Sequence, residues 1–251
     1  RFVVITFGAP AVGNAAFAET YGDKIRLLRI SNRKDPIPGS LQTFFGGYKQ
    51  FGEKINYSMT AKVSSVQHDM TMYFDYSVNQ LYKAFDAEIA AGRLKDIPNT
   101  KEAAGVPKVA LWIAAPENLD YVAYVTDIKR MLLDEYRRVL PSYIVLDKAL
   151  HMSSGYVDVL EIKSRLAGAD YIVVCGIDGR RSREQEYWYL ELQQSIFTAD
   201  GKMLSLASFG KKVAPGIGNI QAAGENFLEA KAELHKQLPF VIMQQEPKIQ
   251  E

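Results

Sequence analysis

The sequence contains one cysteine, Cys175, and three histidines, and this scarcity excludes several kinds of site. A single cysteine cannot form an intrachain disulfide or a site with several thiolate ligands. The histidines, His68, His151 and His235, stand far apart and show neither the HxH nor the HExxH spacing of paired zinc ligands. We therefore expect no metal and no other cofactor.

An excess of one charge and long apolar runs are also missing. The 30 Lys and Arg residues almost balance the 29 Asp and Glu residues, which argues against a nucleic-acid partner or a polybasic membrane anchor. The longest apolar runs, such as Phe2–Phe7 and Tyr171–Cys175, are far shorter than the roughly 20 residues of a transmembrane helix. We expect no transmembrane segment, and the 47% hydrophobic and 24% charged residues are typical of a globular protein.

The first residues read as a buried strand already under way. Phe2–Phe7 is apolar and β-branched, which is typical of an interior strand of a parallel sheet with neighbours on both sides. No methionine, signal peptide or turn precedes it. We expect further sequence upstream of Arg1, so the absence of a signal peptide leaves the compartment open.

Two α/β domains are predicted, residues 1–94 and 108–251, joined by a linker over residues 95–107 that is rich in charge, proline and glycine. In the first, a strand, a helix capped by Asn14, a second strand and a long helix from His68 predict a parallel sheet. In the second, strands and helices alternate before a hairpin, which predicts a small domain with a mixed sheet. Its expected elements are Val109–Ala114, Glu117–Leu140, Tyr143–Leu146, Val157–Ala167, Tyr171–Gly176, Trp188–Ile196, Met203–Ser208 and Gly224–Lys236.

Four segments of the first domain, in order along the chain, resemble the class 3 lipase family. The resemblance implies the carboxy-terminal part of an α/β-hydrolase domain, and an activity on lipid or other ester substrates. The segments are Ile5-Thr-Phe-Gly-Ala-Pro-Ala-Val-Gly-Asn14 with Phe17-Ala18, Leu28-Arg-Ile-Ser-Asn-Arg-Lys-Asp-Pro-Ile-Pro38, Gly47-Tyr48 with Gly52-Glu53, and His68-Asp-Met-Thr-Met-Tyr73.

By position in these segments, Asp35 matches the aspartate of the family's catalytic triad and His68 matches its histidine. The residues themselves agree with this interpretation. Asp35 follows the carboxyl end of a parallel strand, where open α/β sheets place their sites, and Pro36 and Pro38 stiffen its loop. We expect the imidazole to accept a serine proton, while the carboxylate fixes the ring and stabilises the imidazolium.

No serine in the 251 residues stands in a G-x-S-x-G sequence. The chain order in α/β-hydrolases is serine, acid, histidine, so we expect the nucleophile upstream of Arg1. Ser40, Ser64 and Ser65 lack the flanking glycines of a nucleophile elbow. Cys175 lies in an apolar strand and is expected to be an inert core residue. This chain by itself is therefore expected to be inactive.

Several residues have a structural interpretation beside the functional one. Taken alone, Asp35 could be a turn aspartate and His68 a helix-entry residue, and only their joint placement in four matched segments favours the triad. Gly8 and Gly13-Asn14 are expected to be turn and cap residues. The aromatic tract Phe44–Phe51 could line an acyl pocket, form a lid or pack in the core.

Two positions depart from the resemblance. Ala11 stands where the family has an arginine, and Gln50 stands where it has the histidine of a Y-x-H segment. Neither position belongs to the triad. A divergent substrate or a weakened activity therefore remains an alternative.

In the second domain, Ala169-Asp-Tyr-Ile-Val-Val-Cys-Gly-Ile177 and the hairpin that follows are similar to small α/β domains of envelope lipoproteins. These are the TolB amino-terminal, curli-secretion and penicillin-binding-protein-activator domains. The resemblance implies a binding or scaffolding module, a protein partner for residues 108–251, and a periplasmic, cell-envelope or secreted location. The charged segment Asp178–Glu184 is expected to be a solvated loop, and His151 and His235 are expected on the surface.

Two functions from different classes follow. The first is a lipase or esterase whose serine precedes this chain. The alternative is a non-enzymatic envelope protein in which a degenerate hydrolase domain and the second domain only bind partners.

Overall fold

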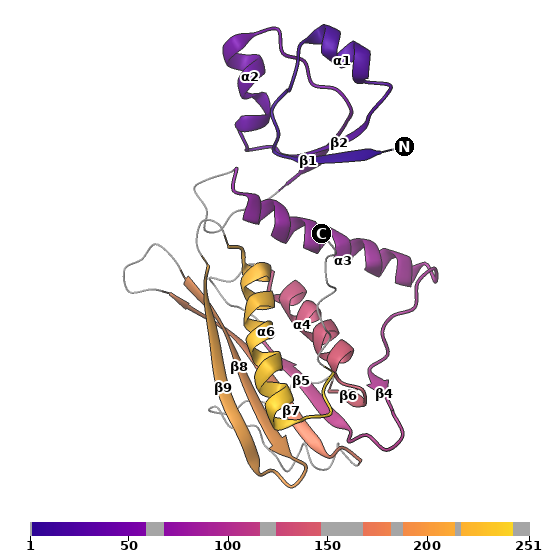
Figure 1. Ribbon diagram of the computed structural model, residues 1–251, viewed down its shortest axis with the longest axis vertical. Helices are drawn as coiled ribbons and strands as arrows, with labels where there is room; N and C mark the ends of the chain where they lie inside the picture. The colour runs from indigo at the N-terminus through magenta and orange to yellow at the C-terminus, as the bar shows by residue number, and fades with distance from the viewer. Residues whose placement is uncertain are drawn as a thin grey trace, which may run out of the picture. The chain divides into compact units, whose positions relative to one another are not determined.

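The computed structural model describes residues 2–58, 68–115, 124–146, 168–181, 188–213 and 217–242 (Figure 1). The chain divides into two compact units, residues 1–81 with 215–218, and residues 82–214 with 219–251. The division falls inside helix α3 (Met70–Ala90). The domain boundaries expected at residues 94 and 108 stay a prediction.

The first unit contains a three-stranded parallel sheet in the order β1-β2-β3, which confirms the expected α/β class. Asn14 caps the first helix as expected, because its side chain accepts a hydrogen bond from the Phe17 N–H at 3.0 Å. Strand β2 is the second strand that the sequence predicted, and it ends at Asn32. The elements are β1 (Val3–Phe7), α1 (Ala15–Tyr21), β2 (Arg26–Asn32), α2 (Ile37–Phe45), β3 (Glu53–Tyr57) and the first part of α3.

Part of the expected loop after β2 is a helix. Pro36 and Pro38 were both expected in the Asp35 loop, but α2 begins at Ile37 with a proline in its first turn. Proline fits there because the first helical N–H groups have no partner within the helix. The aromatic pair at the end of α2, Phe44 and Phe45, is 77% and 74% exposed, so the core interpretation of these two residues is wrong.

Strand β1 lies at the edge of the sheet. Within the described residues it pairs with β2 alone, and Val3, Val4 and Ile5 are 49%, 40% and 53% exposed. The second neighbour that was expected for this strand is not among the described residues.

The core of the first unit lies between the sheet and the start of α3. Ile30 and Tyr73 are its buried members, and the Phe7 ring meets the Tyr73 ring edge-on at 6.1 Å. Partly buried side chains of β3 and α3 complete this cluster; they are Ile55, Tyr57, Met72 and Tyr76. The packing places Tyr73 beside the end of β2, from which the Asp35 loop leaves.

The second unit contains a six-stranded mixed sheet in the order β4-β6-β5-β7-β8-β9, as expected for its fold class. Strand β5 is parallel to β6 and β7, whereas β7, β8 and β9 form an antiparallel meander. The elements are β4 (Thr100–Lys101), β5 (Val109–Ala114), α4 (Val125–Val139), β6 (Tyr143–Val145), β7 (Tyr171–Arg181), β8 (Trp188–Thr198), β9 (Met203–Val213) and α6 (Asn219–Gln237).

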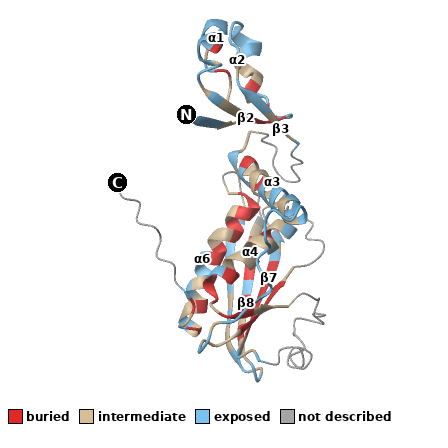
Figure 2. Ribbon diagram, turned by 90° about the vertical axis from the view of Figure 1, so that its right-hand side faces the viewer, coloured by how far each residue is buried: buried red, intermediate tan, exposed pale blue. Residues whose placement is uncertain are grey.

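Helices α4 and α6 pack against each other and against the sheet of this unit (Figure 1). The Tyr136 ring of α4 meets the Phe227 ring of α6 edge-on at 4.9 Å. Buried residues gather on the inward sides of both helices and on the central strands (Figure 2). The buried positions recur every 3 to 4 residues in the helices, form continuous runs in β5 and β7, and alternate in β8.

Several details of the second unit differ from expectation. Thr100–Lys101, inside the expected linker, form β4 and pair with β6. Strand β7 continues to Arg181, so the expected charged loop begins as a strand. Helix α6 begins at Asn219 rather than Gly224. His235 is half-buried, with Nδ1 3.0 Å from the Val241 carbonyl, so it is not a plain surface residue.

Some expectations fall outside the described residues. These are the predicted helix Val157–Ala167, His151, and the first residues of the predicted helix Glu117–Leu140. In the part of the chain that is described, no helix combines the length and apolar character needed to cross a membrane.

Candidate active site

The candidate site begins in the loop between β2 and α2. The Asp35 N–H donates to the Asn32 carbonyl at 3.1 Å, which turns the chain back as it leaves the strand. The Asp35 carboxylate then accepts from the Ile37 N–H through Oδ1 at 2.9 Å. This side chain is fully buried, with 0% of its surface exposed. The loop therefore holds a carboxylate inside the protein with one oxygen, Oδ2, left for other donors.

His68 is the first of those donors. Its Nδ1 lies 2.8 Å from Asp35 Oδ2, although the two residues are 33 positions apart. The His68 side chain is 38% exposed, in contrast to the buried carboxylate. With Asp35 ionised, Nδ1 carries the proton and donates it, which leaves Nε2 with the lone pair that can accept a proton.

Tyr73 is the second donor to the same oxygen, and the sequence analysis did not assign it a role. Its hydroxyl donates to Asp35 Oδ2 at 2.7 Å and accepts from the Asn32 N–H at 2.9 Å. Burial raises the pKa of Tyr73 well above its ordinary value of about 10, and the neighbouring Asp35 raises it further. The phenol therefore remains a hydrogen-bond donor across the whole working pH range.

A signal for Tyr73 was present in the sequence. Tyr73 lies in the long helix expected from His68, at helical spacing with apolar residues further along, and a buried tyrosine hydroxyl needs a partner. The sequence alone did not show which polar group at the end of β2 would be that partner.

Gly8 forms the floor beneath the pair. Its φ is +58°, a conformation that favours glycine, and its N–H donates to the Ile30 carbonyl at 2.8 Å. A Cβ atom at this position would lie 2.9 Å from Asp35 Oδ2 and 2.9 Å from His68 Nδ1. Gly8 is thus a turn residue, as expected, and its lack of a side chain also makes room for the Asp35–His68 pair.

The described residues place no nucleophile beside His68. Among the described residues, no serine forms a hydrogen bond with it: Ser31 Oγ bonds to Asn56, and Ser40 Oγ donates to the Ile37 carbonyl. Ser64 and Ser65 lie outside the described residues. Cys175 is buried in the second unit, where burial raises the pKa of its thiol to about 12, so it is not poised to attack.

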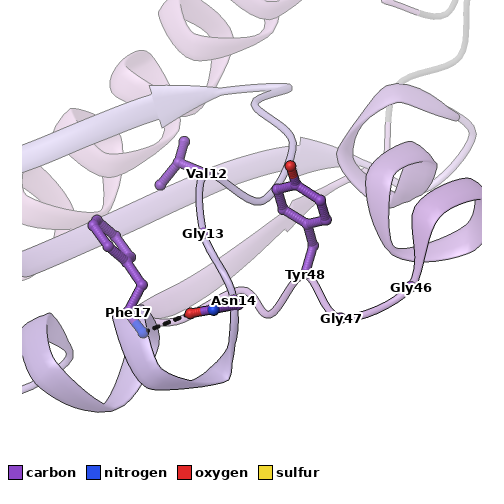
Figure 3. A pocket seen from close by; sticks show the side chains of 7 residues that line it. All are labelled: Val12, Gly13, Asn14, Phe17, Gly46, Gly47 and Tyr48. Carbon is purple, nitrogen blue, oxygen red and sulfur yellow. Dashed lines mark hydrogen bonds between the residues drawn. The ribbon is translucent and has the colours of Figure 1, made fainter.

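An open groove lies on the first unit, between the turn after β1 and the turn after α2. Its volume is about 480 Å³, and three larger side chains stand around it (Figure 3). Backbone pairing between Asn14 and Tyr48 joins the two turns. Of the aromatic tract Phe44–Phe51, Tyr48 lines this groove. The lining residues are Val12, Gly13, Asn14, Phe17, Gly46, Gly47 and Tyr48.

Metal ligands do not gather at either place. Within the ranges that the structure describes, no group of three or more His, Cys, Asp and Glu side chains could hold a metal ion. The chemistry available at the Asp35–His68 pair is proton transfer by an oriented imidazole.

Residues 1–45 match the family model of class 3 lipases. The match is to a hydrolase family and includes Asp35, but it covers 45 of 251 residues and ends before His68. No curated protein matches the sequence.

Several solved structures resemble part of the fold. The hypothetical protein CT253 from Chlamydia trachomatis is 8% identical, with 53% of this chain and 98% of that chain covered and a TM-score of 0.39. The PelC dodecamer from Paraburkholderia phytofirmans is 14% identical, with 59% and 96% covered and a TM-score of 0.37. TolB from Acinetobacter baumannii is 12% identical, with 56% and 30% covered and a TM-score of 0.32. No function follows from scores this low, so the envelope resemblance and the protein partner of residues 108–251 stay predictions.

Proposed function

We propose that the first unit belongs to a serine ester hydrolase of the class 3 lipase type, in which Asp35 and His68 are the acid and the base of the triad. The observation that carries the proposal is the 2.8 Å contact between a partly exposed imidazole and a fully buried carboxylate. This arrangement leaves Nε2 as the ring nitrogen that can accept a proton, and it stabilises the imidazolium once a proton has been taken up.

The serine and the oxyanion donors would come from sequence outside these 251 residues. Strand β1 supports this part of the proposal, because its apolar side chains are exposed and its outer edge has no partner in the described structure. A parallel sheet normally buries such a strand. A further strand beside β1 would place a nucleophile at the same carboxyl edge as Asp35 and His68.

Lipid or other esters with an apolar acyl chain are the proposed substrates. The groove lined by Val12, Phe17 and Tyr48 supports this choice, since it is open and mostly apolar. Phe44 and Phe45 add exposed aromatic surface in the chain segment next to it. Large exposed apolar patches on proteins are commonly binding sites.

The test is ester hydrolysis by the full-length gene product, with short- and long-chain nitrophenyl esters. We expect His68→Ala and Asp35→Asn each to lower kcat by roughly a thousandfold or more. The matched controls are His235→Ala in the second unit and Asp69→Asn, whose carboxylate bonds only to the start of α3 in the described structure. We expect these controls to hydrolyse the esters at nearly the wild-type rate.

Two results would overturn the proposal. One is a full-length protein that folds but hydrolyses no ester, which would favour the binding role instead. The other is wild-type activity in a folded His68→Ala or Asp35→Asn variant.

A further inference from the structure

Gln50 connects the two ends of the loop that carries Asp35. Its Oε1 accepts a hydrogen bond from Arg29 Nη1, and its Nε2 donates to the Pro38 carbonyl. Arg29 lies in β2, three residues before the turn at Asn32, and Pro38 lies in the first turn of α2. We call these three residues the Gln50 bridge, which connects the strand before the Asp35 loop to the helix after it.

The start of α2 has few other restraints. Pro36 and Pro38 have no N–H group, and Pro36 at the N-cap makes no capping hydrogen bond through its side chain. The Ile37 N–H is held by Asp35 itself. The Pro38 carbonyl is therefore the point at which a group from elsewhere in the unit fixes the helix start.

Arg29 depends on the same amide. Its Nε is buried without a partner, and no carboxylate forms an ion pair with it in the part of the chain that is described. Burial lowers the pKa of its guanidinium, since charge is disfavoured away from water. The Gln50 oxygen offsets part of this cost by accepting a hydrogen bond from the guanidinium, and this bond stabilises the position of the amide between β2 and α2.

Two backbone features hold Gln50 against the sheet. The Lys49 N–H donates to the Gly13 carbonyl at 2.9 Å. Gly52 has a φ of +79°, and a Cβ there would lie 2.5 Å from the Leu27 carbonyl oxygen. This close approach needs glycine, and it keeps the segment around Gln50 next to β2.

We propose that Gln50 is a positioning residue for Asp35. By linking Arg29 to Pro38 it fixes the spacing of the loop ends, and through them the direction of the carboxylate toward His68. Its role in catalysis rests on the proposed function, whereas its effect on the Asp35–His68 contact does not.

The test uses Gln50→Ala, Gln50→Glu and Gln50→His. Alanine removes both hydrogen bonds. Glutamate keeps the oxygen that accepts from Arg29 but has no N–H to donate to the Pro38 carbonyl. This variant therefore tests the hydrogen bond to Pro38 while the guanidinium keeps its partner. A neutral histidine has one donor and one acceptor, and we expect it to restore the bridge. Gln80→Ala is the control, because Gln80 lies on α3 and bonds to its neighbour Asn79.

The first measurement is the low-field proton resonance of the His68 Nδ1–H in the 251-residue chain, by NMR. It reports the hydrogen bond to Asp35 directly and needs no nucleophile. We expect the resonance to shift upfield or broaden in Gln50→Ala and Gln50→Glu, and to return in Gln50→His. It should be unchanged in Gln80→Ala. Far-UV circular dichroism on the same samples identifies variants that are folded.

The second measurement is ester hydrolysis by the full-length gene product. We expect Gln50→Glu to lower kcat about 10- to 100-fold with little change in KM, and Gln50→His to recover most of it. A folded Gln50→Glu variant with a wild-type resonance would overturn the proposal. If the full-length protein hydrolyses no ester, the proposed function fails, while the resonance still decides whether Gln50 positions Asp35.

Discussion

Removing the hydroxyl of Tyr73 tests the candidate site most directly. In Tyr73→Phe the ring still fills its place in the core, because phenylalanine keeps the edge-on contact with Phe7. Two hydrogen bonds are lost, one to the Asp35 carboxylate and one from the Asn32 N–H. Asn32 is only 3% exposed, so its N–H is left without water as a substitute.

The cost follows from these two bonds. A hydrogen bond to a charged group contributes about 1.5–3 kcal/mol, and a buried donor without an acceptor costs about 1–3 kcal/mol. The two effects share one hydroxyl and are not fully additive. We therefore expect the free energy of unfolding of the first unit to fall by about 3 kcal/mol. With an m-value of roughly 1–1.5 kcal/mol/M for a unit of this size, its urea midpoint should fall by about 2–3 M.

The two units can be followed separately. Both tryptophans, Trp112 and Trp188, belong to the second unit, so tryptophan fluorescence follows that unit alone, whereas circular dichroism follows both. We expect Tyr73→Phe to lower the urea midpoint of the first unit, which circular dichroism detects. The midpoint measured by tryptophan fluorescence should stay unchanged. Tyr76→Phe is the control, because Tyr76 lies one turn further along α3 and its hydroxyl has no hydrogen bond among the described residues.

The pH dependence gives a second signature. The folded pKa of Tyr73 is raised, so the folded unit keeps the phenol proton at a pH where the unfolded chain, with a pKa of about 10, loses it. The Tyr73 contribution is thus complete below pH 10 and declines as pH rises toward the folded pKa, by about 1.4 kcal/mol per pH unit. Tyr73→Phe should lack this alkaline slope. The reasoning is refuted if Tyr73→Phe is as stable as Tyr76→Phe and has the same slope above pH 10.

Three further predictions follow. Gly8→Ala should destabilise the first unit by about 2 kcal/mol and abolish the low-field His68 resonance, because it places a Cβ 2.9 Å from the ring at a positive φ. The control is Gly39→Ala, which has open space around it and should be neutral or slightly stabilising by circular dichroism. Gln194→Leu removes a fully buried amide that accepts from Tyr136 at 2.6 Å and donates to the Ala230 carbonyl at 3.0 Å, so tryptophan fluorescence should report a loss of about 2–4 kcal/mol. Cys175, with its thiol pKa raised to about 12, should react with a disulfide reagent at pH 8 at least about a thousandfold more slowly than a free thiol, and at the ordinary rate in denaturant.

The sequence predicted most strands and helices because their apolar spacing is set by local geometry. The run at β5 and the alternation at β8 are buried in the pattern that a strand requires. The N-cap at Asn14 was readable for the same reason, since the cap involves a residue only three positions away.

The missed features depend on tertiary contacts. Helix α2 begins in a proline-rich stretch that reads as a loop, and its start is fixed by Gln50 from the next connection rather than by a local cap. Tyr73 meets Asp35 across 38 positions, and no local pattern contains that pairing. The contact between His68 and Asp35 was expected only because each residue lies in a segment that resembles the class 3 lipase family.

The Asp35 environment is a poor design for stability alone. A buried carboxylate loses its hydration. The donors around it, on Ile37, His68 and Tyr73, offset this loss only if each keeps its position. Gly8 adds a positive φ, and its missing side chain leaves the space that the pair occupies. An apolar side chain at position 35 would avoid the cost of dehydrating a carboxylate. A partly exposed imidazole, a buried carboxylate and a glycine that leaves room for them occur together, and this combination favours the proposed proton transfer at Nε2 over a packing role. A stable Asp35→Leu variant with a well-folded first unit would support that reasoning, whereas collapse of the unit would return Asp35 to a structural role.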